Sequence, residues 1–220
     1  DYLVRLQGYL RGEEVPFEAG GDIDSLGLAD YSGSSRIVWT AAAEPKVPVD
    51  VAATGPRVIA AAARHADRVS LNVGADVERI RWGIEVARNA REKAGLSPEI
   101  PISAYLPLAV HDDPEEAMRI GAGQVSLFAR FSAMYGNVVG PAQKDQREVL
   151  QNIYSAYDMQ QHGRRHGPQE AAVTDEFARS FGIFGPPTHC ADRLSELIEL
   201  GVDRFVLRGT PLDPANPDSS

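Results

Sequence analysis

Residues 47–83 read VPVDVAATGPRVIAAAARHADRVSLNVGADVERIRWG, which is the pattern of two successive strand, glycine turn and helix units. In the first unit, a β-branched run over 47–53 leads into the turn Thr54-Gly55-Pro56. Apolar residues then recur at helical spacing: Val58, Ile59, Ala62, Ala63 and Ala66. The pattern predicts a strand that feeds directly into a helix.

The second unit repeats this order. Its strand alternates apolar and other residues over 69–73, and Gly74-Ala75-Asp76 makes the turn. The next helix carries an apolar stripe: Ile80, Ile84 and Ala87. Both turns therefore follow the carboxyl end of a predicted strand.

The two turns are candidates for a phosphate site. Glycine lets the backbone approach a ligand closely, and the first amides of a helix are unpaired donors at the positive end of its dipole. Two such turns side by side could hold one phosphate. The alternative is that Thr54 and Asp76 only cap helices, while Gly55 and Gly74 only satisfy turn geometry.

Further units follow the first two. After 102–110, Asp113 and Pro114 open a helix that we expect to run towards Tyr135. A last helix begins at Pro186-Pro187-Thr188 and stops at Gly201 before a final strand. The predicted strands lie near 47–53, 69–73, 102–110 and 204–208. Helices between strands predict an α/β fold with a parallel sheet.

The later part of the helix predicted after Asp113 is rich in large apolar groups. They are Val125, Leu127, Phe128, Phe131, Met134 and Tyr135. Such a stripe can line a substrate cavity, but it more often belongs to the core. The sequence leaves both interpretations open.

Other segments depart from the alternation. Leu3, Leu6 and Leu10 share one face of a short helix that ends near Gly12. Residues 13–46 predict a loop excursion with a small hairpin around Ile37-Val38-Trp39. We interpret 136–185 as an insertion, helical around Gln146 to Gln161, within a single domain over 1–220, and 211–220 as a frayed tail.

Composition excludes several classes of function. The 220 residues include 22 basic and 31 acidic side chains, so the net charge of −9 argues against a nucleic-acid partner. Cys190 is the only cysteine, and no apolar segment approaches membrane-spanning length, so we expect a cytoplasmic protein. The glycines around His162 and His166 argue against a metal site there. No Gly-x-Ser-x-Gly elbow or Walker-type loop occurs.

Three segments carry a resemblance to a known family. They are PKVPVDVAATGPRVIAAAARHADRV, LNVGADVERIRWGIEVAR and FGIFGPPTHCADRLSELIELGVDRFVL. With them the chain resembles the carboxyl-terminal part of the bacterial luciferase-like monooxygenase superfamily. It looks most similar to the deazaflavin-dependent branch, which includes methylenetetrahydromethanopterin reductases and coenzyme-dependent sugar-phosphate or alcohol dehydrogenases.

The resemblance implies a (β/α)8 TIM barrel with the coenzyme at the carboxyl ends of its strands. It also implies that Thr54 and Gly55, then Val73, Gly74 and Ala75, hold the coenzyme's phosphate. The match begins at the helix before the fifth strand, so only strands 5 to 8 with a helical insertion are expected here. The family's usual catalytic groups would lie in the absent half, and no catalytic residue is assigned.

The implied function is that of an oxidoreductase that moves hydride between a deazaflavin coenzyme (factor 420) and a small organic substrate. An FMN-dependent luciferase-like monooxygenase, which uses reduced flavin and oxygen, is the alternative enzyme. A non-catalytic half-barrel that binds flavin or a partner chain is the alternative outside catalysis. Because a four-strand piece exposes two sheet edges, we expect a homo-oligomer or a missing N-terminal half to complete it.

Overall fold

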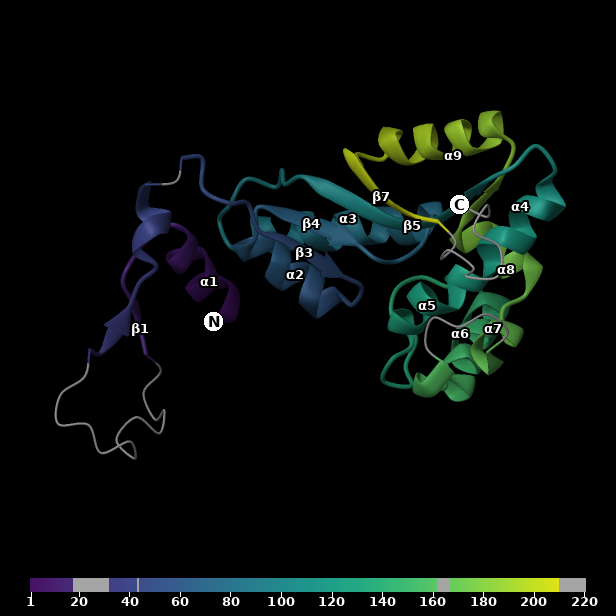
Figure 1. The fold of residues 1–220 in the computed structure, drawn as a ribbon, viewed down its shortest axis with the longest axis horizontal. Helices are drawn as coiled ribbons and strands as arrows, with labels where there is room; N and C mark the ends of the chain where they lie inside the picture. The colour runs from purple at the N-terminus through teal and green to yellow at the C-terminus, as the bar shows by residue number, and fades with distance from the viewer. Residues whose placement is uncertain (18–31, 43, 162–166, 210–220) are drawn as a thin grey trace.

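The computed structural model describes residues 1–17, 32–42, 44–161 and 167–209 (Figure 1). Its strands are β1 (Val15–Pro16), β2 (Ser34–Ser35), β3 (Asp50–Ala53), β4 (Arg68–Leu71), β5 (Ile102–Val110), β6 (Ile183–Gly185) and β7 (Arg204–Arg208). Its α-helices are α1 (Tyr2–Leu10), α2 (Pro56–His65), α3 (Val77–Glu92), α4 (Pro114–Gly121), α5 (Val125–Ala129), α6 (Lys144–Ala156), α7 (Pro168–Ala171), α8 (Asp175–Phe181) and α9 (Pro187–Glu199). Short 3₁₀ helices are η2 (Val38–Ala42), η3 (Ala122–Gln124), η4 (Arg130–Ser132) and η5 (Met159–Gln161).

The main sheet is parallel throughout. Its strands β3, β4 and β5 are neighbours in that order, β7 pairs with the first part of β5, and β6 pairs with the last part of β5. The register aligns Ala53 with Leu71, Leu71 with Ala104, and Ala104 with Phe205. The predicted α/β class and all four predicted strands are therefore confirmed, and within the described residues the sheet is open.

One face of this sheet is covered by helices. Side chains alternate along each strand, so every second residue points to the same face. On the helix-covered face, Val69 and Leu71 of β4 pack with residues of α2, α3 and α9 in one core cluster. The apolar stripe predicted for α3 belongs to it, since Ile80, Ile84 and Ala87 are buried there. The opposite face carries the alternate residues and faces away from these helices.

A group of helices separates β5 from β6. Figure 1 shows α4, α5, α6, α7 and α8 gathered beyond the end of β5, where the chain leaves the carboxyl end of the sheet. They enclose a second apolar core with Leu150, Ile153, Phe177, Phe181 and Phe184 among its buried members. The sequence predicted a helical stretch around Gln146 to Gln161 here, where α6 and η5 are found, but it did not predict strand β6, which is only three residues long.

The helix after Asp113 is shorter than expected. We predicted that it would run towards Tyr135, but α4 ends at Gly121 and is followed by the short pieces η3, α5 and η4. Glycines at 121 and 123 weaken the helix locally. A Cβ atom at Gly121 would also collide with the Phe184 ring, so this close packing requires glycine.

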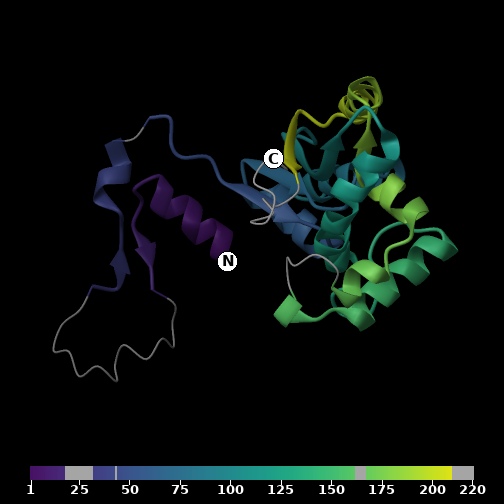
Figure 2. The same ribbon diagram turned by 45° about the vertical axis from the view of Figure 1, so that its right-hand side comes forward.

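The amino-terminal segment forms an arm. Figures 1 and 2 show α1 and strand β1 to one side of the main sheet. The predicted first helix is confirmed as α1, and Gln7 joins it to the body by donating hydrogen bonds to the His65 carbonyl and the Asp67 carboxylate. A hairpin ladder does occur, but it pairs β1 with β2, whereas Val38 and Trp39 lie in η2 and are exposed.

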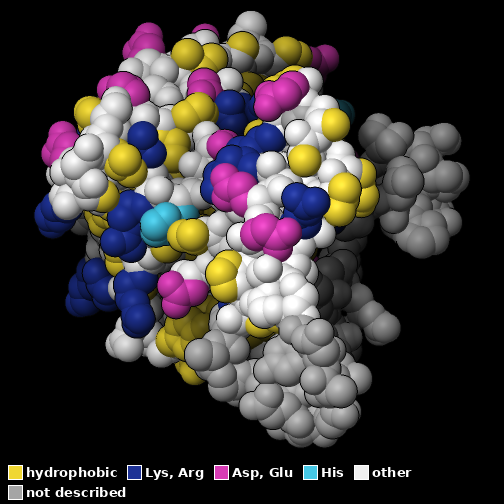
Figure 3. Space-filling view, turned by 90° about the vertical axis from the view of Figure 1, so that its left-hand side faces the viewer, with side chains coloured by type: hydrophobic (Ala, Val, Ile, Leu, Met, Phe, Trp, Pro, Cys, Tyr) yellow, Lys and Arg dark blue, Asp and Glu magenta, His cyan; other side chains and the backbone are white. Residues whose placement is uncertain are grey.

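The surface mixes charges of both signs. On the face shown in Figure 3, Lys and Arg side chains stand among Asp and Glu side chains. Among the described residues, several charges pair directly, as Arg11 does with Glu13 at 2.6 Å and Lys46 with Asp67 at 2.6 Å. In the part of the chain that is described, no helix has the length and apolar character needed to cross a membrane. The expected tail at 211–220 lies outside the described residues.

Candidate functional site

The first predicted turn forms the open amino terminus of α2. Gly55 is the N-cap residue, so no side chain accepts a hydrogen bond from the first-turn amides. Pro56 has no N–H, and the N–H groups of Arg57 and Val58 lack partners among the described residues. A Cβ atom placed on Gly55 would meet nothing within 4 Å. This end of α2 therefore offers free donors in open space to an anion.

Thr54 has a different role from the one its position suggested. Its Oγ1 donates a hydrogen bond of 3.0 Å to the main-chain carbonyl of Asn72, at the end of the neighbouring strand. The alternative that Thr54 caps α2 is therefore wrong, because Gly55 occupies the N-cap position. With its proton committed to Asn72, the Thr54 hydroxyl ties the two turns together.

The second predicted turn is buried. Val73 and Ala75 have no exposed surface, and Gly74 adopts a φ of +82°, which favours glycine. The Ala75 N–H donates to the Phe181 carbonyl at 2.8 Å, and the Phe181 ring lies against Gly74. The Gly74 N–H has no hydrogen-bond partner among the described residues. Of the two turns, the first is the more accessible.

Asp76 does cap a helix, as the alternative interpretation of the second turn predicted. Its Oδ1 accepts from the Arg79 N–H at 3.1 Å at the start of α3, and its Oδ2 accepts from Gln146 of α6 at 3.1 Å. This carboxylate therefore links the second turn to the helices inserted after β5.

Arg79 of α3 stabilises the second turn through side-chain hydrogen bonds. Its side chain is 3% exposed and donates to the carbonyls of Val73 (3.1 Å), Val139 (3.1 Å) and Pro141 (2.7 Å) and to the Ser132 hydroxyl (2.7 Å). Burial lowers the pKa of Arg79 to about 10, against the favourable charge of Asp76, so the guanidinium stays charged at neutral pH. Sequence reasoning missed this residue, because an arginine on a helix is usually a surface residue.

A row of side chains lies near these turns on the face of the sheet that points away from α2, α3 and α9. Tyr105 of β5 pairs in register with Val206 of β7. Asn72 and Tyr105 each follow the aligned pair Leu71 and Ala104, and Thr54 follows Ala53, which aligns with Leu71. Thr54, Asn72, Tyr105 and Val206 therefore lie side by side at the carboxyl end of the sheet. Asn72 was also missed, since its sequence context shows only a strand end.

The large apolar residues predicted after Asp113 divide between core and surface. Val125 is fully buried in the second core, while Met134 and Tyr135 are exposed. Phe128 is half-buried against that core, and its ring centroid lies 6.4 Å from that of Tyr105. Phe128 thus lies beside the row on the sheet. The predicted apolar residues as a whole do not line a single cavity.

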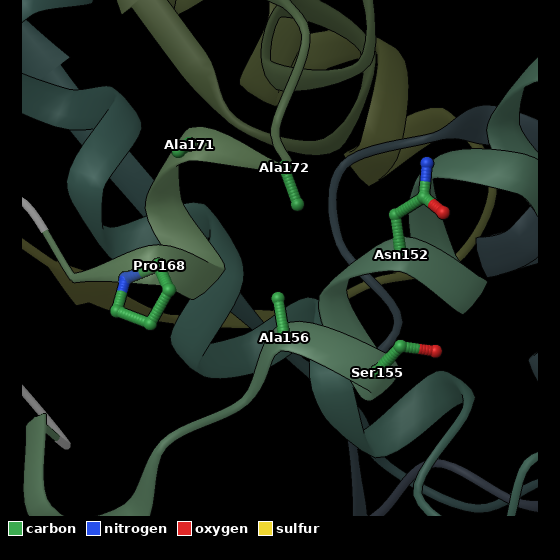
Figure 4. A pocket seen from close by; sticks show the side chains of 6 residues that line it. All are labelled: Asn152, Ser155, Ala156, Pro168, Ala171 and Ala172. Atoms are coloured by element: carbon green, nitrogen blue, oxygen red, sulfur yellow. The ribbon is translucent and has the colours of Figure 1, made fainter.

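Elsewhere, the surface has a shallow depression of about 470 Å³ between α6 and α7 (Figure 4). Only two side chains there are polar, and the rest are alanine and proline. The lining residues are Asn152, Ser155, Ala156, Pro168, Ala171 and Ala172. This depression offers no ionisable or aromatic group, so it carries no chemistry of its own. His162 and His166 lie outside the described residues.

Comparisons with known proteins agree with the resemblance seen in the sequence. The family described as luciferase-like monooxygenase matches residues 4–204. A curated relative, the 5,10-methylenetetrahydromethanopterin reductase of Methanolobus tindarius, is 26% identical over 216 residues. That match covers 96% of this chain and 60% of the relative. The chain thus spans less than two thirds of that enzyme's length.

Solved structures share the fold. The coenzyme F420 dependent tetrahydromethanopterin reductase from Methanopyrus kandleri aligns with a TM-score of 0.61 at 19% identity, over 99% of this chain and 58% of that one. The oxygenating constituent of 3,6-diketocamphane monooxygenase from Pseudomonas putida, in complex with FMN, aligns with a TM-score of 0.52 at 14% identity, over 99% and 57% respectively. These likenesses confirm a parallel α/β fold of the luciferase-like type.

Proposed function

This chain belongs to the luciferase-like monooxygenase family, and from that premise we propose that it is part of an oxidoreductase that uses the deazaflavin coenzyme F420. The reaction would transfer hydride between this coenzyme and a small organic substrate, as in a methylenetetrahydromethanopterin reductase. Support comes from the curated relative at 26% identity, whose name is that of such a reductase. No nucleic acid or membrane partner enters the proposal.

The residues present fit a coenzyme phosphate. The single observation that carries this fit is the open amino terminus of α2, where Gly55 leaves the first-turn amides uncapped and the space above them empty. Thr54 would position this turn, and the free Gly74 N–H of the second turn would face the same edge of the sheet. Val73 and Ala75 would support Gly74 through their bonds to Arg79 and Phe181.

When bound, the coenzyme supplies the hydride chemistry, and the protein supplies binding and orientation. The helix dipole of α2 would favour the negative phosphate. Tyr105 and Phe128 would offer an aromatic border beside the row on the sheet and would help exclude water. The helices inserted after β5 would close the carboxyl end of the sheet, where ligands bind in barrels of this type.

FMN is the second candidate coenzyme, because the family description names a monooxygenase and one monooxygenase of the same fold was solved in complex with FMN. The same phosphate site would serve, because FMN also ends in a phosphate. An FMN enzyme would be a monooxygenase that consumes oxygen with reduced flavin. The two coenzymes can therefore be separated by the product of the reaction as well as by affinity.

We also propose that β3 is completed by another strand. Within the described residues its outer edge has no strand partner, and an open edge offers unpaired main-chain groups. Either a second copy of the chain or a further segment of the same protein would cover it. Light scattering of the complete gene product would give its mass and decide between these arrangements.

The experiment that tests the function uses the complete product of the gene that encodes this chain. Coenzyme F420 and FMN are each titrated while protein fluorescence is followed, and then reduced coenzyme is mixed with methylenetetrahydromethanopterin. We expect tighter binding of F420 and its substrate-dependent oxidation without oxygen uptake. Oxygen uptake with reduced FMN would establish the monooxygenase instead. Binding without turnover in either assay would indicate a non-catalytic flavin-binding protein.

A further inference from the structure

Asn72 lies at the centre of the row on the face of the sheet that points away from α2, α3 and α9. Its main chain is fixed on both sides, because its N–H donates to the Ala53 carbonyl at 2.9 Å and its carbonyl accepts from Thr54. Its side chain shares a face with Ser70, two residues earlier on the same strand. The Asn72 amide is therefore held at the carboxyl end of β4 by contacts that do not involve the amide itself.

The Asn72 side-chain oxygen has no hydrogen-bond partner in the described part of the chain. The residue is 9% exposed, and Oδ1 is among the buried polar atoms without a partner. A buried acceptor that lacks a donor destabilises the fold, so such a group calls for a functional explanation. Its position is where ligands bind in parallel α/β proteins.

The neighbouring polar groups on this face are already used. Ser70 Oγ donates to the Asp50 carboxylate at 2.6 Å, one level below Asn72. Thr54 Oγ1 donates to the Asn72 carbonyl at 3.0 Å. Among the three, Asn72 is the one whose side chain presents an acceptor that still needs a donor.

We propose that Asn72 Oδ1 accepts a hydrogen bond from the imide N–H of the bound coenzyme ring and so fixes the orientation of that ring beside Tyr105. The inference rests on the proposed function. Flavin and deazaflavin rings share this N–H, so the contact serves either coenzyme. Asn72 lies between Thr54, which leads to the phosphate turn, and Tyr105, which leads to the aromatic pair with Phe128. A ring placed there has its phosphate end towards α2.

The test combines a variant with a modified ligand. Asn72→Leu keeps a similar volume and removes the acceptor, and a coenzyme analogue methylated on the imide nitrogen removes the donor. The complete protein is titrated with both ligands by fluorescence. We expect wild type to bind the methylated analogue about tenfold more weakly than the parent coenzyme, and Asn72→Leu to bind both with the same reduced affinity.

Stability provides the second readout. Because the free protein leaves Oδ1 unpaired, Asn72→Leu should unfold at the same temperature as wild type or higher. A residue with only a structural role would instead lower the unfolding temperature. Ser70→Ala is the matched control, since Ser70 lies on the same face of the same strand, two residues before Asn72. It should keep the wild-type affinity and the wild-type discrimination between the two ligands.

Several results would overturn the inference. Equal affinity of wild type for the parent and methylated ligands would do so without any variant. The inference would also be overturned if Asn72→Leu still discriminated between the parent and methylated ligands. It would be overturned as well if this variant bound the parent ligand as tightly as wild type. If wild type binds neither F420 nor FMN, the proposed function fails and the inference fails with it, whereas binding with unaltered discrimination in the variant overturns the inference alone.

Discussion

Thr54 and Asn72 are joined by a hydrogen bond of 3.0 Å from a side-chain hydroxyl to a main-chain carbonyl. The bond links the ends of β3 and β4, just past the last aligned pair of the two strands. It fixes the start of α2 relative to the second turn. The geometry of the proposed phosphate site therefore depends on a hydroxyl whose proton is already donated within the protein.

Thr54→Val should loosen this link. It keeps the shape of the side chain and leaves the Asn72 carbonyl without its donor, so we expect a loss of about 1 kcal/mol in unfolding free energy. Coenzyme affinity should fall several-fold, because the turn is less well positioned. Urea denaturation and fluorescence titration measure the two effects. Thr54→Ser, which retains the hydroxyl, is the control and should resemble wild type in both.

Gly55→Asp should change stability and affinity in opposite directions. Aspartate is a better N-cap than glycine, and the space at Gly55 is open, so the free protein should be as stable or slightly more stable. The new carboxylate would stand where the phosphate is proposed, and coenzyme affinity should drop more than about tenfold. Thermal unfolding and ligand titration give both values. Unchanged coenzyme affinity would show that the phosphate does not bind at this turn.

Gly55→Ala is the matched control for that variant. It adds a Cβ without charge at a φ of −87°, which any residue adopts, and should leave the coenzyme affinity near that of wild type. The equivalent change at Gly74 is not a clean test. A Cβ there would lie 2.6 Å from the Phe181 ring, at a φ of +82°, so loss of binding would follow from misfolding.

Arg79→Met should destabilise the protein strongly. The guanidinium satisfies three carbonyls and one hydroxyl in a site that is almost closed to water, and methionine leaves all four without a donor. We expect a loss of more than about 3 kcal/mol in unfolding free energy, measured in urea. Arg81→Met on the same helix is the control. That arginine is exposed and pairs with Glu78, so its loss should cost less than about 1 kcal/mol.

The parts of the fold that could be predicted from sequence are those with a strong local signal. The strands at 50–53, 68–71, 102–110 and 204–208 were recognisable from alternation and from the turns that end them. Their parallel arrangement followed from the intervening helices. Strand β6 could not be predicted, because three residues carry no period and its pairing with Leu108 to Val110 is set by tertiary structure.

The candidate site was only partly visible. The turn at Gly55 has a local glycine and proline signature, and its openness agrees with that pattern. The turn at Gly74 has a local glycine and aspartate signature, but Phe181, more than 100 positions further along the chain, packs over it. Asn72 and Arg79 are defined by which partners they have or lack in three dimensions. No sequence pattern marks such residues.

Asp67 should make stability depend on acid pH. Partial burial alone would raise the pKa of this carboxyl, but hydrogen bonds from the Lys46 ammonium, the Val49 N–H and the Gln7 amide outweigh it, and the pKa lies below its usual value. A carboxyl with a lowered pKa stabilises the fold above its unfolded-state pKa, about 3.9. This contribution is lost as the pH falls through the lower, folded-state pKa.

Asp67→Asn should therefore be less stable than wild type at pH 7, and the difference should shrink as the pH falls below about 4. Urea denaturation of both proteins across this range measures it. Asp192→Asn is the control, because Asp192 is exposed on α9 and has no partner in the described structure. A difference between Asp67→Asn and wild type that stays constant from pH 7 to pH 3 would mean that packing of the Asp67 side chain, and not its charge, joins α1 to the sheet.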